Sequence, residues 1–289
     1  MKIGIGLPSA IPGVQGSLIL EWAKQAEQGP FSSLGVLDRV VYGNYEPLMA
    51  LAAVAGVTTR LRLMTTVLIA TLRNTGILAK QAASLDALSG GRLTLGLGVG
   101  GREDDFLAAP ATFRARGKHF NEQLTFMERA WSGQPVSERI GVIGPPPVQS
   151  GGPEVLIGGY SEAAIQRVGR WGNGFIAGGR APAQSKQFFQ WAEEAWQKAG
   201  RPGKPRLVAC TYYGLGPHAT EGITKSITNY YSFLGAVAQQ MAKNVPSTPE
   251  AIRSVIHDFT DIGVDELIIW PCIPELEQIA LLANVVNDI

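Results

Sequence analysis

The chain has 289 residues, and its 25 basic and 24 acidic side chains leave a net charge of +1. This balance lacks the basic excess that binding along nucleic acid requires, so we expect no nucleic-acid partner. Glycine is unusually frequent, with 35 residues, or about 12% against roughly 7% in ordinary proteins. Because no Gly-X-Y period accompanies the glycines, and proline is not enriched to match, collagen-like and disordered chains are excluded.

Neither a membrane segment nor a targeting segment is visible. The longest apolar stretches are strand-sized, whereas a membrane span needs roughly 20 residues, and the start, MKIGIGLPSA, has too short an apolar run for a signal peptide. The two cysteines, Cys210 and Cys272, stand far apart and show no metal-binding or redox spacing. We therefore expect a cytoplasmic protein with reduced thiols and no membrane contact.

Short β-rich runs alternate with helical patterns from one end of the chain to the other. Strands are predicted at 2–7, 33–37, 61–67, 93–99, 155–157, 174–177, 207–213 and 266–270. Helices are predicted at 17–28, 47–57, 77–88, 120–131, 161–170 and 182–199, with more after the last two strands.

About eight βα units without a change of composition predict one α/β domain over residues 1–289, a single (β/α)8 TIM barrel rather than a doubly wound sheet. Two stretches, 100–153 and 217–263, are too long for simple connections. They predict insertions after strands four and seven, where loops usually shape the substrate pocket.

The chemistry of a barrel lies at the C-terminal ends of its strands. No lysine follows any predicted strand, which argues against a Schiff-base mechanism. The histidines, His119, His218 and His257, form no pair with metal-binding spacing, so no metal site is expected. His218 follows strand seven and is a candidate substrate contact.

Gly96, Gly98 and Gly101 spell G-x-G-x-x-G. They lie within and just after a strand, with no apolar helix opening behind them, so the context does not fit a dinucleotide-binding turn. Glycines inside a barrel strand either relieve crowding or let a flat ligand approach the wall.

Two glycine turns follow strands five and six and could hold a phosphate. The first ends at Ser161, a good N-cap, so bare amides and a helix N-terminus would face an anion together. The second ends at Arg180, which adds a guanidinium. The alternative is that both are ordinary βα turns. The residues concerned are Gly158, Gly159, Tyr160, Ser161, Gly178, Gly179 and Arg180.

Several segments resemble the luciferase-like monooxygenase family. They are MKIG at the start, LDR at 37–39, TRLRLMTTVL at 59–68, SLDALSGGRLTLGLGVG at 84–100, GGYS at 158–161 and WGNGF at 171–175. The resemblance covers most of residues 1–180 and the final helix, and it is most specific between Thr59 and Phe106.

The resemblance implies a barrel that binds reduced FMN or, alternatively, an 8-hydroxy-5-deazaflavin coenzyme. By position it assigns a non-prolyl cis peptide beneath the flavin ring to Thr66 and Val67. Val99 and Gly100 match positions beside the flavin edge, and Gly158 to Ser161 match the phosphate loop.

The chain departs from the family after strand two. Many deazaflavin-dependent members carry Asp-His there, but this chain has Asp38 and Arg39. Arg102 resembles an arginine of the oxygen-using branch, and its alternative role is a loop charge paired with Asp104 or Asp105. These observations make Asp38, Arg39 and Arg102 the candidate catalytic residues. Tyr42 is a candidate polar contact, and the candidate apolar walls are Phe106, Tyr213 and Trp270.

The leading hypothesis is a flavin-dependent monooxygenase that uses reduced FMN and oxygen on a small organic substrate. No nicotinamide-binding segment is recognisable, which suggests a separate flavin reductase as partner. The alternatives are a deazaflavin-dependent oxidoreductase that transfers hydride without oxygen, and a non-catalytic flavin-binding protein. The resemblance further implies a homodimer.

Overall fold

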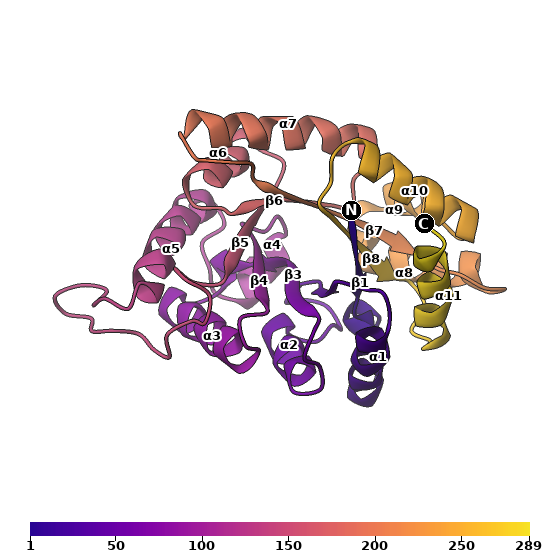
Figure 1. Ribbon diagram of the computed structural model, residues 1–289, viewed down its shortest axis with the longest axis horizontal. Helices are drawn as coiled ribbons and strands as arrows, with labels where there is room; N and C mark the ends of the chain where they lie inside the picture. The colour runs from indigo at the N-terminus through magenta and orange to yellow at the C-terminus, as the bar shows by residue number, and fades with distance from the viewer.

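The computed structural model describes all 289 residues. Its strands are β1 (Lys2–Gly6), β2 (Ser33–Val36), β3 (Arg62–Ile69), β4 (Leu93–Gly98), β5 (Glu154–Gly158), β6 (Gly174–Gly178), β7 (Arg206–Tyr213) and β8 (Glu266–Pro271). All eight pair in parallel in chain order and close into a barrel, with helices around its outside (Figure 1). The predicted (β/α)8 barrel is confirmed.

The helices have clear local causes. Ser161, Asn74 and Thr248 each cap a helix by accepting a backbone N–H with the side chain, which satisfies an otherwise orphaned donor. The α-helices are α1 (Gly16–Gln28), α2 (Pro47–Ala55), α3 (Thr75–Leu88), α4 (Glu103–Ala108), α5 (Arg116–Trp131), α6 (Glu162–Arg170), α7 (Pro182–Lys198), α8 (Ala219–Tyr230), α9 (Ala236–Lys243), α10 (Pro249–Asp261) and α11 (Glu277–Asn287). The short 3-10 helices are η1 (Pro8–Ala10), η2 (Ala70–Leu72) and η3 (Ser232–Leu234).

Two connections hold extra elements. Between β4 and β5 lie α4, α5 and a loop at 132–153 that projects from the barrel (Figure 1). Between β7 and β8 lie α8, η3 and α9 before α10. No helix was predicted between 88 and 120, and this was wrong, because α4 forms there and α5 begins at Arg116. Three acidic residues in the first turn of α4 favour its start.

The apolar core has two parts. The larger cluster fills the layer between the barrel and its helices, and the smaller one lies inside the barrel and under α8 and α9. Members of the smaller cluster include Met64, Val208, Ile268 and Trp270. The barrel is thus a packed core rather than a pore.

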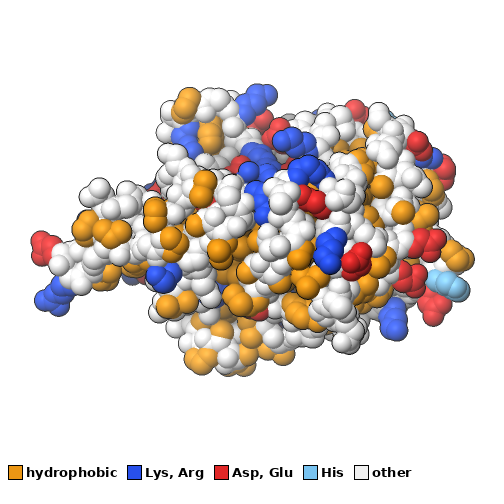
Figure 2. Space-filling view, turned by 60° about the horizontal axis from the view of Figure 1, so that its bottom comes forward, with side chains coloured by type: hydrophobic (Ala, Val, Ile, Leu, Met, Phe, Trp, Pro, Cys, Tyr) orange, Lys and Arg blue, Asp and Glu red, His pale blue; other side chains and the backbone are white.

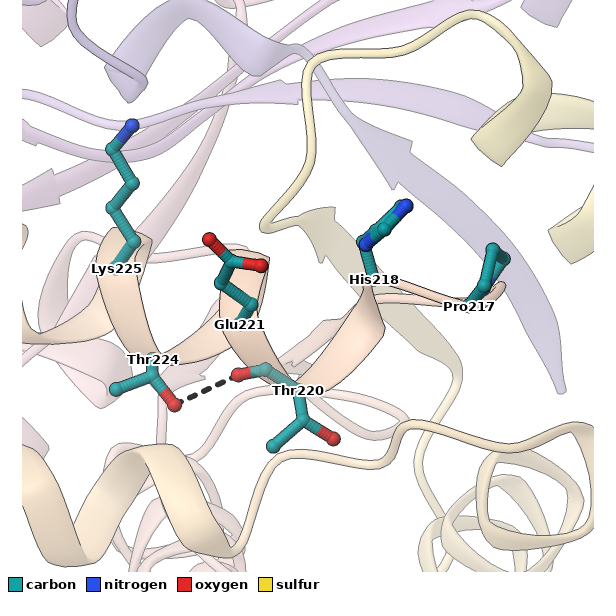
Figure 3. A pocket seen from close by; sticks show the side chains of 6 residues that line it. All are labelled: Pro217, His218, Thr220, Glu221, Thr224 and Lys225. Carbon is teal, nitrogen blue, oxygen red and sulfur yellow. Dashed lines mark hydrogen bonds between the residues drawn. The ribbon is translucent and has the colours of Figure 1, made fainter.

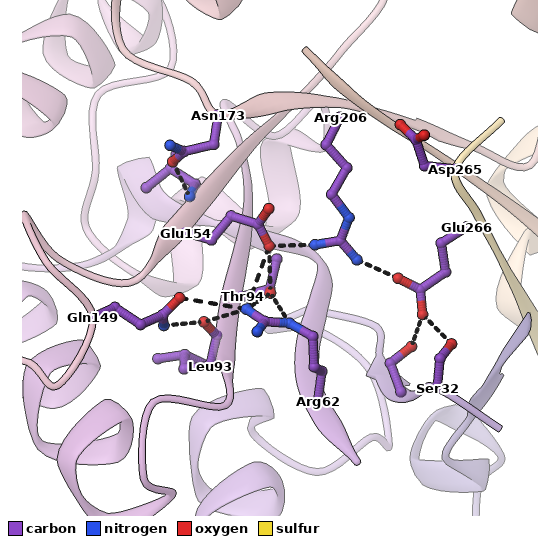
Figure 4. A network of polar contacts seen from close by, with 12 residues as sticks. Ser32, Arg62, Leu93, Thr94, Gln149, Glu154, Asn173, Arg206, Asp265 and Glu266 are labelled. Atoms are coloured by element: carbon purple, nitrogen blue, oxygen red, sulfur yellow. Dashed lines mark hydrogen bonds and ion pairs between the residues drawn. The ribbon is translucent and has the colours of Figure 1, made fainter. Parts of the chain in front are cut away.

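A charged network closes the end of the barrel opposite the predicted site (Figure 4). Arg206 lies between Glu154 and Glu266, and all three are the first residues of their strands. Arg62 donates to Thr94 Oγ1 at 2.7 Å and lies 3.4 Å from Glu154. Polar groups at the N-terminal face of such barrels contribute to stability rather than to catalysis. No helix has the length and apolar composition that crossing a bilayer requires.

Candidate functional site

The residues predicted as a site meet at one rim of the barrel. They lie at or just after the C-terminal ends of β2, β3, β4, β5 and β6, which are neighbours in the sheet. Parallel strands bring their C-terminal ends to the same edge, so segments far apart in sequence become adjacent. The rim is therefore one continuous surface rather than scattered positions.

The peptide bond between Thr66 and Val67 is cis, as the family resemblance implied. The pairing of β3 with β4 shifts register between Thr65 and Leu68, so the chain bulges here. Two hydroxyls fix the bulge to both neighbouring strands. Thr66 Oγ1 donates to Val36 O and Thr65 Oγ1 donates to Gly96 O, each at 2.8 Å.

The glycines of β4 and β5 make room for this bulge. A Cβ at Gly96 would lie 2.1 Å from Thr65 O, one at Gly98 would lie 3.1 Å from Val67, and one at Gly158 would lie 2.8 Å from Val67. Gly96 and Gly98 of the G-x-G-x-x-G spelling therefore relieve crowding at the bulge, which was one of the two roles that the sequence suggested for glycines inside a barrel strand. The spelling is not a dinucleotide turn.

The turn after β4 also needs glycine. Gly100 has φ +72°, and a Cβ there would lie 2.6 Å from Ile69 Cγ2. The preceding Val99 is half-buried, and its carbonyl accepts from the Thr71 hydroxyl at 2.8 Å. Both residues lie beside the end of β3.

The turn after β5 has the properties of an anion cradle. Gly159 has φ +134°, and the backbone N–H groups of Tyr160 and Ser161 donate to no acceptor in the chain. Ser161 Oγ accepts from Ala164 N at 3.3 Å and so caps α6, whose first turn carries partial positive charge. Two amides without an acceptor thus stand directly before a helix N-terminus.

The turn after β6 lies beside this cradle. The Tyr160 hydroxyl donates to Gly178 O, and the Arg180 guanidinium lies 4.4 Å from the centre of the Tyr160 ring. Gly179 has φ +63°, and its N–H donates to Cys210 O at 3.2 Å. Arg180 is exposed and has no carboxylate partner, so its charge is available at the cradle.

Asp38 is not free to act on a ligand. Its buried carboxylate accepts Ile69 N at 2.7 Å and two bonds from Arg73 at 2.7 and 3.2 Å. Burial raises the pKa of Asp38, and the adjacent Arg73 opposes that rise. Arg73 also binds Glu46, which caps α2. Asp38 and Arg73 together therefore connect the end of β3 to the start of α2. These contacts make it a positioning residue rather than a catalytic one.

Arg39 is buried, with 8% of its surface exposed. It donates to Tyr230 O at 2.6 Å and to Val41 O at 3.2 Å, and no carboxylate lies within ion-pair distance. Its guanidinium carbon lies 4.3 Å from the ring centre of Tyr42 and 5.2 Å from that of Tyr230. Arg39 thus attaches the β7–β8 insertion to the end of β2.

Arg102 pairs with the acidic start of α4. It binds Asp104 and lies 3.5 Å from Asp105 Oδ2, so the loop-charge alternative describes its contacts correctly. Asp105 Oδ1 in turn accepts the N–H groups of Val40 and Val41 at 3.0 and 2.8 Å. The loops after β2 and β4 are therefore joined through one carboxylate.

Aromatic side chains form a cluster at the rim, and most of them were not predicted as site residues from the sequence. Tyr212 packs on Trp270 with ring centres 4.9 Å apart, and its hydroxyl lies 2.9 Å from that of Tyr231. The prediction of Tyr213 as a wall was wrong by one position, because strand side chains alternate. Tyr213 points into the outer core, where its hydroxyl donates to Gln278 O at 3.0 Å.

The two other predicted wall residues lie in different places. Trp270 belongs to the interior cluster, whereas Phe106 packs on Phe113 beside Gly100. The consecutive aromatic residues Tyr230 and Tyr231 were the available signal for the aromatic cluster at the rim.

A separate hollow of about 570 Å³ lies on the first turns of α8 (Figure 3). Its lining is polar and includes His218, Glu221 and Lys225. None of the predicted cofactor-binding residues lines it, so His218 lies apart from the cradle. No group of three or more His, Cys, Asp and Glu side chains in the chain could hold a metal ion.

Comparison with known proteins agrees with this geometry. The sequence model of the family described as "Luciferase-like monooxygenase" matches residues 1–266. A Mycobacterium tuberculosis protein, "Uncharacterized protein Rv0940c", is 28% identical over 212 residues, which cover 62% of this chain and 71% of that protein.

Two solved structures share the fold across nearly the whole chain. Monooxygenase RslO1 from Streptomyces bottropensis superposes with a TM-score of 0.82 at 22% identity, covering 100% of this chain and 99% of that one. An F420-dependent secondary alcohol dehydrogenase, in complex with an F420-acetone adduct, gives a TM-score of 0.85 at 18% identity, covering 99% of both chains. At these identities the likeness shows the fold alone. The family match over most of the chain shows more: this protein belongs to the luciferase-like monooxygenase family, an oxidoreductase family whose members use flavin or deazaflavin cofactors.

Proposed function

We propose that the protein is an oxidoreductase that takes up reduced FMN and oxidises a small organic substrate with oxygen. The observation that carries this proposal is the cradle after β5, where the amides of Tyr160 and Ser161 have no acceptor. A phosphate of the cofactor would satisfy both amides and gain from the N-terminus of α6.

The residues at the rim fit such a group. Gly158, Gly159, Tyr160 and Ser161 would hold the phosphate, with Gly178, Gly179 and Arg180 closing its other side. Thr66, Val67, Val99 and Gly100 would line the ring, because they form the wall between β3 and β5. A bound reduced flavin supplies the electrons for the reaction, and the protein orients it and excludes water.

The F420-dependent structural neighbour makes a deazaflavin coenzyme the second candidate. That cofactor would supply a hydride without oxygen, and it would use the same cradle because it also carries a phosphate. The distinction is experimental. We expect reduced FMN to bind. We expect its reoxidation to depend on the substrate, and this dependence should appear only when oxygen is present. Anaerobic turnover with the reduced deazaflavin, together with failure of reduced FMN, would replace the first candidate by the second.

A non-catalytic carrier is the remaining candidate. It would bind one of the two cofactors tightly and show no substrate-dependent reoxidation across a panel of small organic substrates.

The cradle itself is tested by Ser161→Ala. We expect this change to weaken cofactor binding several-fold, measured by fluorescence titration with FMN and with the deazaflavin. Thr248→Ala is the matched control, because Thr248 caps α10 in the same way by accepting Ala251 N at 3.2 Å. Loss of a cap costs about 1 kcal/mol of stability in each variant. Equal cofactor affinities in the two variants would mean that the phosphate lies elsewhere.

Two partners complete the proposal. A separate reductase would deliver the reduced flavin, and adding one should replace chemically reduced FMN in the assay. A second copy of the chain would cover α2 and α3, where Met49, Ile77 and Leu88 are each more than half exposed. Figure 2 brings the lower side of Figure 1 forward and shows apolar side chains spread between charged ones. Light scattering should give a dimer mass, and Leu88→Glu should shift it toward the monomer.

A further inference from the structure

One arginine at the rim is buried with part of its hydrogen-bonding capacity unused. Arg39 has a buried Nε–H without an acceptor. Arg102 Nε also makes no hydrogen bond, but it lies 3.5 Å from Asp105 Oδ2, so its charge is paired. The guanidinium carbons of Arg39 and Arg102 lie against one ring, 5.8 and 4.3 Å from the ring centre of Phe233. The unused donor of Arg39 therefore lies under the same ring as the paired Arg102.

Two structural arginines elsewhere in the chain pair this donor. Arg92 Nε donates to Ser89 O at 2.7 Å, and Arg167 Nε donates to Asn121 Oδ1 at 2.7 Å. A buried donor without a partner costs about 1–3 kcal/mol, so packing alone gives no reason to keep one. A buried cation that lacks a carboxylate, as Arg39 does, adds to that cost.

The side chain that covers the two arginines is loosely held. Phe233 is 52% exposed, and no residue of η3 is buried. Gly235 follows at φ +55°, a conformation that favours glycine, and its Cβ would meet nothing within 4 Å. Phe233 can therefore leave the guanidinium groups without disturbing the core.

We propose that Arg39 forms a subsite for the oxyanion group of an organic substrate, a carboxylate or a phosphate, and that Phe233 covers this subsite until the substrate enters. Bonds from a guanidinium to an oxyanion are about twice as strong as those to neutral acceptors, so an anion competes well with the carbonyls that Arg39 now binds. The surrounding rings of Tyr42 and Tyr230 favour a planar apolar body on that anion.

This inference rests on the proposed function only for calling the ligand a substrate. The cofactor cradle follows β5 and β6, whereas Arg39 follows β2, so the two anion positions lie on different strands of the rim. Binding at the subsite is therefore measurable on protein without cofactor. Failure of the flavin titrations would leave the anion result standing, and the reverse also holds.

The experiment compares benzoate, phenyl phosphate and the neutral benzamide by calorimetry and thermal shift. We expect at least one of the two anions to bind wild-type protein and benzamide to bind at least about tenfold more weakly, because it offers no charge to the guanidinium. Whichever anion binds more tightly identifies the group on the substrate.

Three variants locate the site. Arg39→Gln should weaken the anion about tenfold or more, with Arg39→Lys in between, because lysine keeps the charge but not the fork. Arg170→Gln is the control, since Arg170 is an exposed arginine that stacks on Trp171 at 4.3 Å and is the last residue of α6, at the helix end away from the rim. It should bind like wild type.

Phe233→Ala supplies a readout that a merely structural Arg39 would not produce. Removing the cover should tighten anion binding about threefold or more, because more molecules then present an open subsite. The change should also be tolerated, since Phe233 is mostly in solvent. Equal binding of benzamide and the anions, unchanged binding in Arg39→Gln, or no gain in Phe233→Ala would each overturn the proposal.

Discussion

The crowding at the β3 bulge makes a quantitative prediction about three glycines. A Cβ at Gly96 would lie 2.1 Å from Thr65 O, whereas real Cβ atoms essentially never approach closer than 3.0 Å. The obstacle is backbone within a buried strand, so it cannot turn aside, and the carbonyl would have to move by roughly 1 Å. We expect Gly96→Ala to lower the free energy of unfolding by about 3 kcal/mol.

The two other glycines calibrate this value. At Gly98 the new Cβ would lie 3.1 Å from Val67 Cγ2, and a shift of a few tenths of an ångström relieves it, so the cost is about 1 kcal/mol. At Gly101 no atom would lie within 4 Å of the new Cβ, and φ lies outside the left-handed region. The change in the free energy of unfolding should therefore stay within about 0.5 kcal/mol. The expected order is therefore Gly96, then Gly98, then Gly101.

Urea unfolding, followed by tryptophan fluorescence, measures the differences, and a melting temperature gives a second measure. A loss of 3 kcal/mol should lower Tm by roughly 6–12 °C in a chain of this size. Combining Gly98→Ala with Val67→Ala should recover part of the Gly98 cost, because the clash is with that side chain. If Gly96→Ala were as stable as Gly101→Ala, the Thr65 carbonyl could not lie where the bulge places it.

Three further changes test the contacts that support the rim. Glu266→Gln should cost about 1.5–3 kcal/mol in urea unfolding, because it removes the charge of one of the two carboxylates that bind Arg206, while Glu154 keeps its own; a loss below 1 kcal/mol would contradict this. Asp38→Asn should destabilise by a similar amount through Arg73, yet leave the pH profile of turnover unmoved if Asp38 only positions its neighbours. Burial raises the pKa of Glu27, but hydrogen bonds from backbone N–H groups outweigh it and hold the pKa below its usual value. The contribution of this carboxylate to stability is therefore complete above the unfolded pKa of 4.5 and is lost as the pH falls through the lower folded pKa. Glu27→Gln should reduce that acid dependence in pH-resolved melting curves, and an unchanged dependence would refute the assignment.

The barrel was predictable because its signals are local and repeated. Each strand is a short apolar run, and each run is followed by a helical pattern with a cap or a proline at its start. The boundaries mostly agree to within one or two residues. The exceptions are α4, which is short and charged, and α5, whose first turn carries no apolar stripe.

The site was predictable only in part, and for a physical reason. Glycine turns after strands five and six depend on nearby residues, so the cradle at Ser161 could be placed from the sequence. The partner of Asp38 is Arg73, thirty-five residues away, and that of Arg39 is Tyr230 O, 191 residues away. Nothing local announces such pairs, so Asp38 looked like a free catalytic group, and the contact of Arg39 with the β7–β8 insertion was missed.

Which of two consecutive residues at a strand end faces the barrel interior is equally difficult to predict. Tyr212 and Tyr213 are both aromatic and both buried, and only the barrel decides which one faces the interior. An error of one residue exchanges the two faces of a strand. The aromatic cluster at the rim could therefore be identified only from the structure, in which Tyr212 contacts Trp270 and Tyr231.

The titratable groups of the rim restrict the chemistry that the protein itself can perform. Asp38 is held by Arg73 and Asp105 by two backbone amides and Arg102, so both carboxylates are engaged by neighbouring groups. Burial raises the pKa values of Tyr212 and Tyr231, so their hydroxyls stay protonated through neutral pH and serve as hydrogen-bond donors and acceptors. A rim with bare amides, guanidinium groups and neutral phenols suits the binding and orientation of anions but provides little acid–base catalysis. Such a site would need a cofactor to carry the reaction, which is why the proposed function depends on the cradle after β5 rather than on any side chain at the rim.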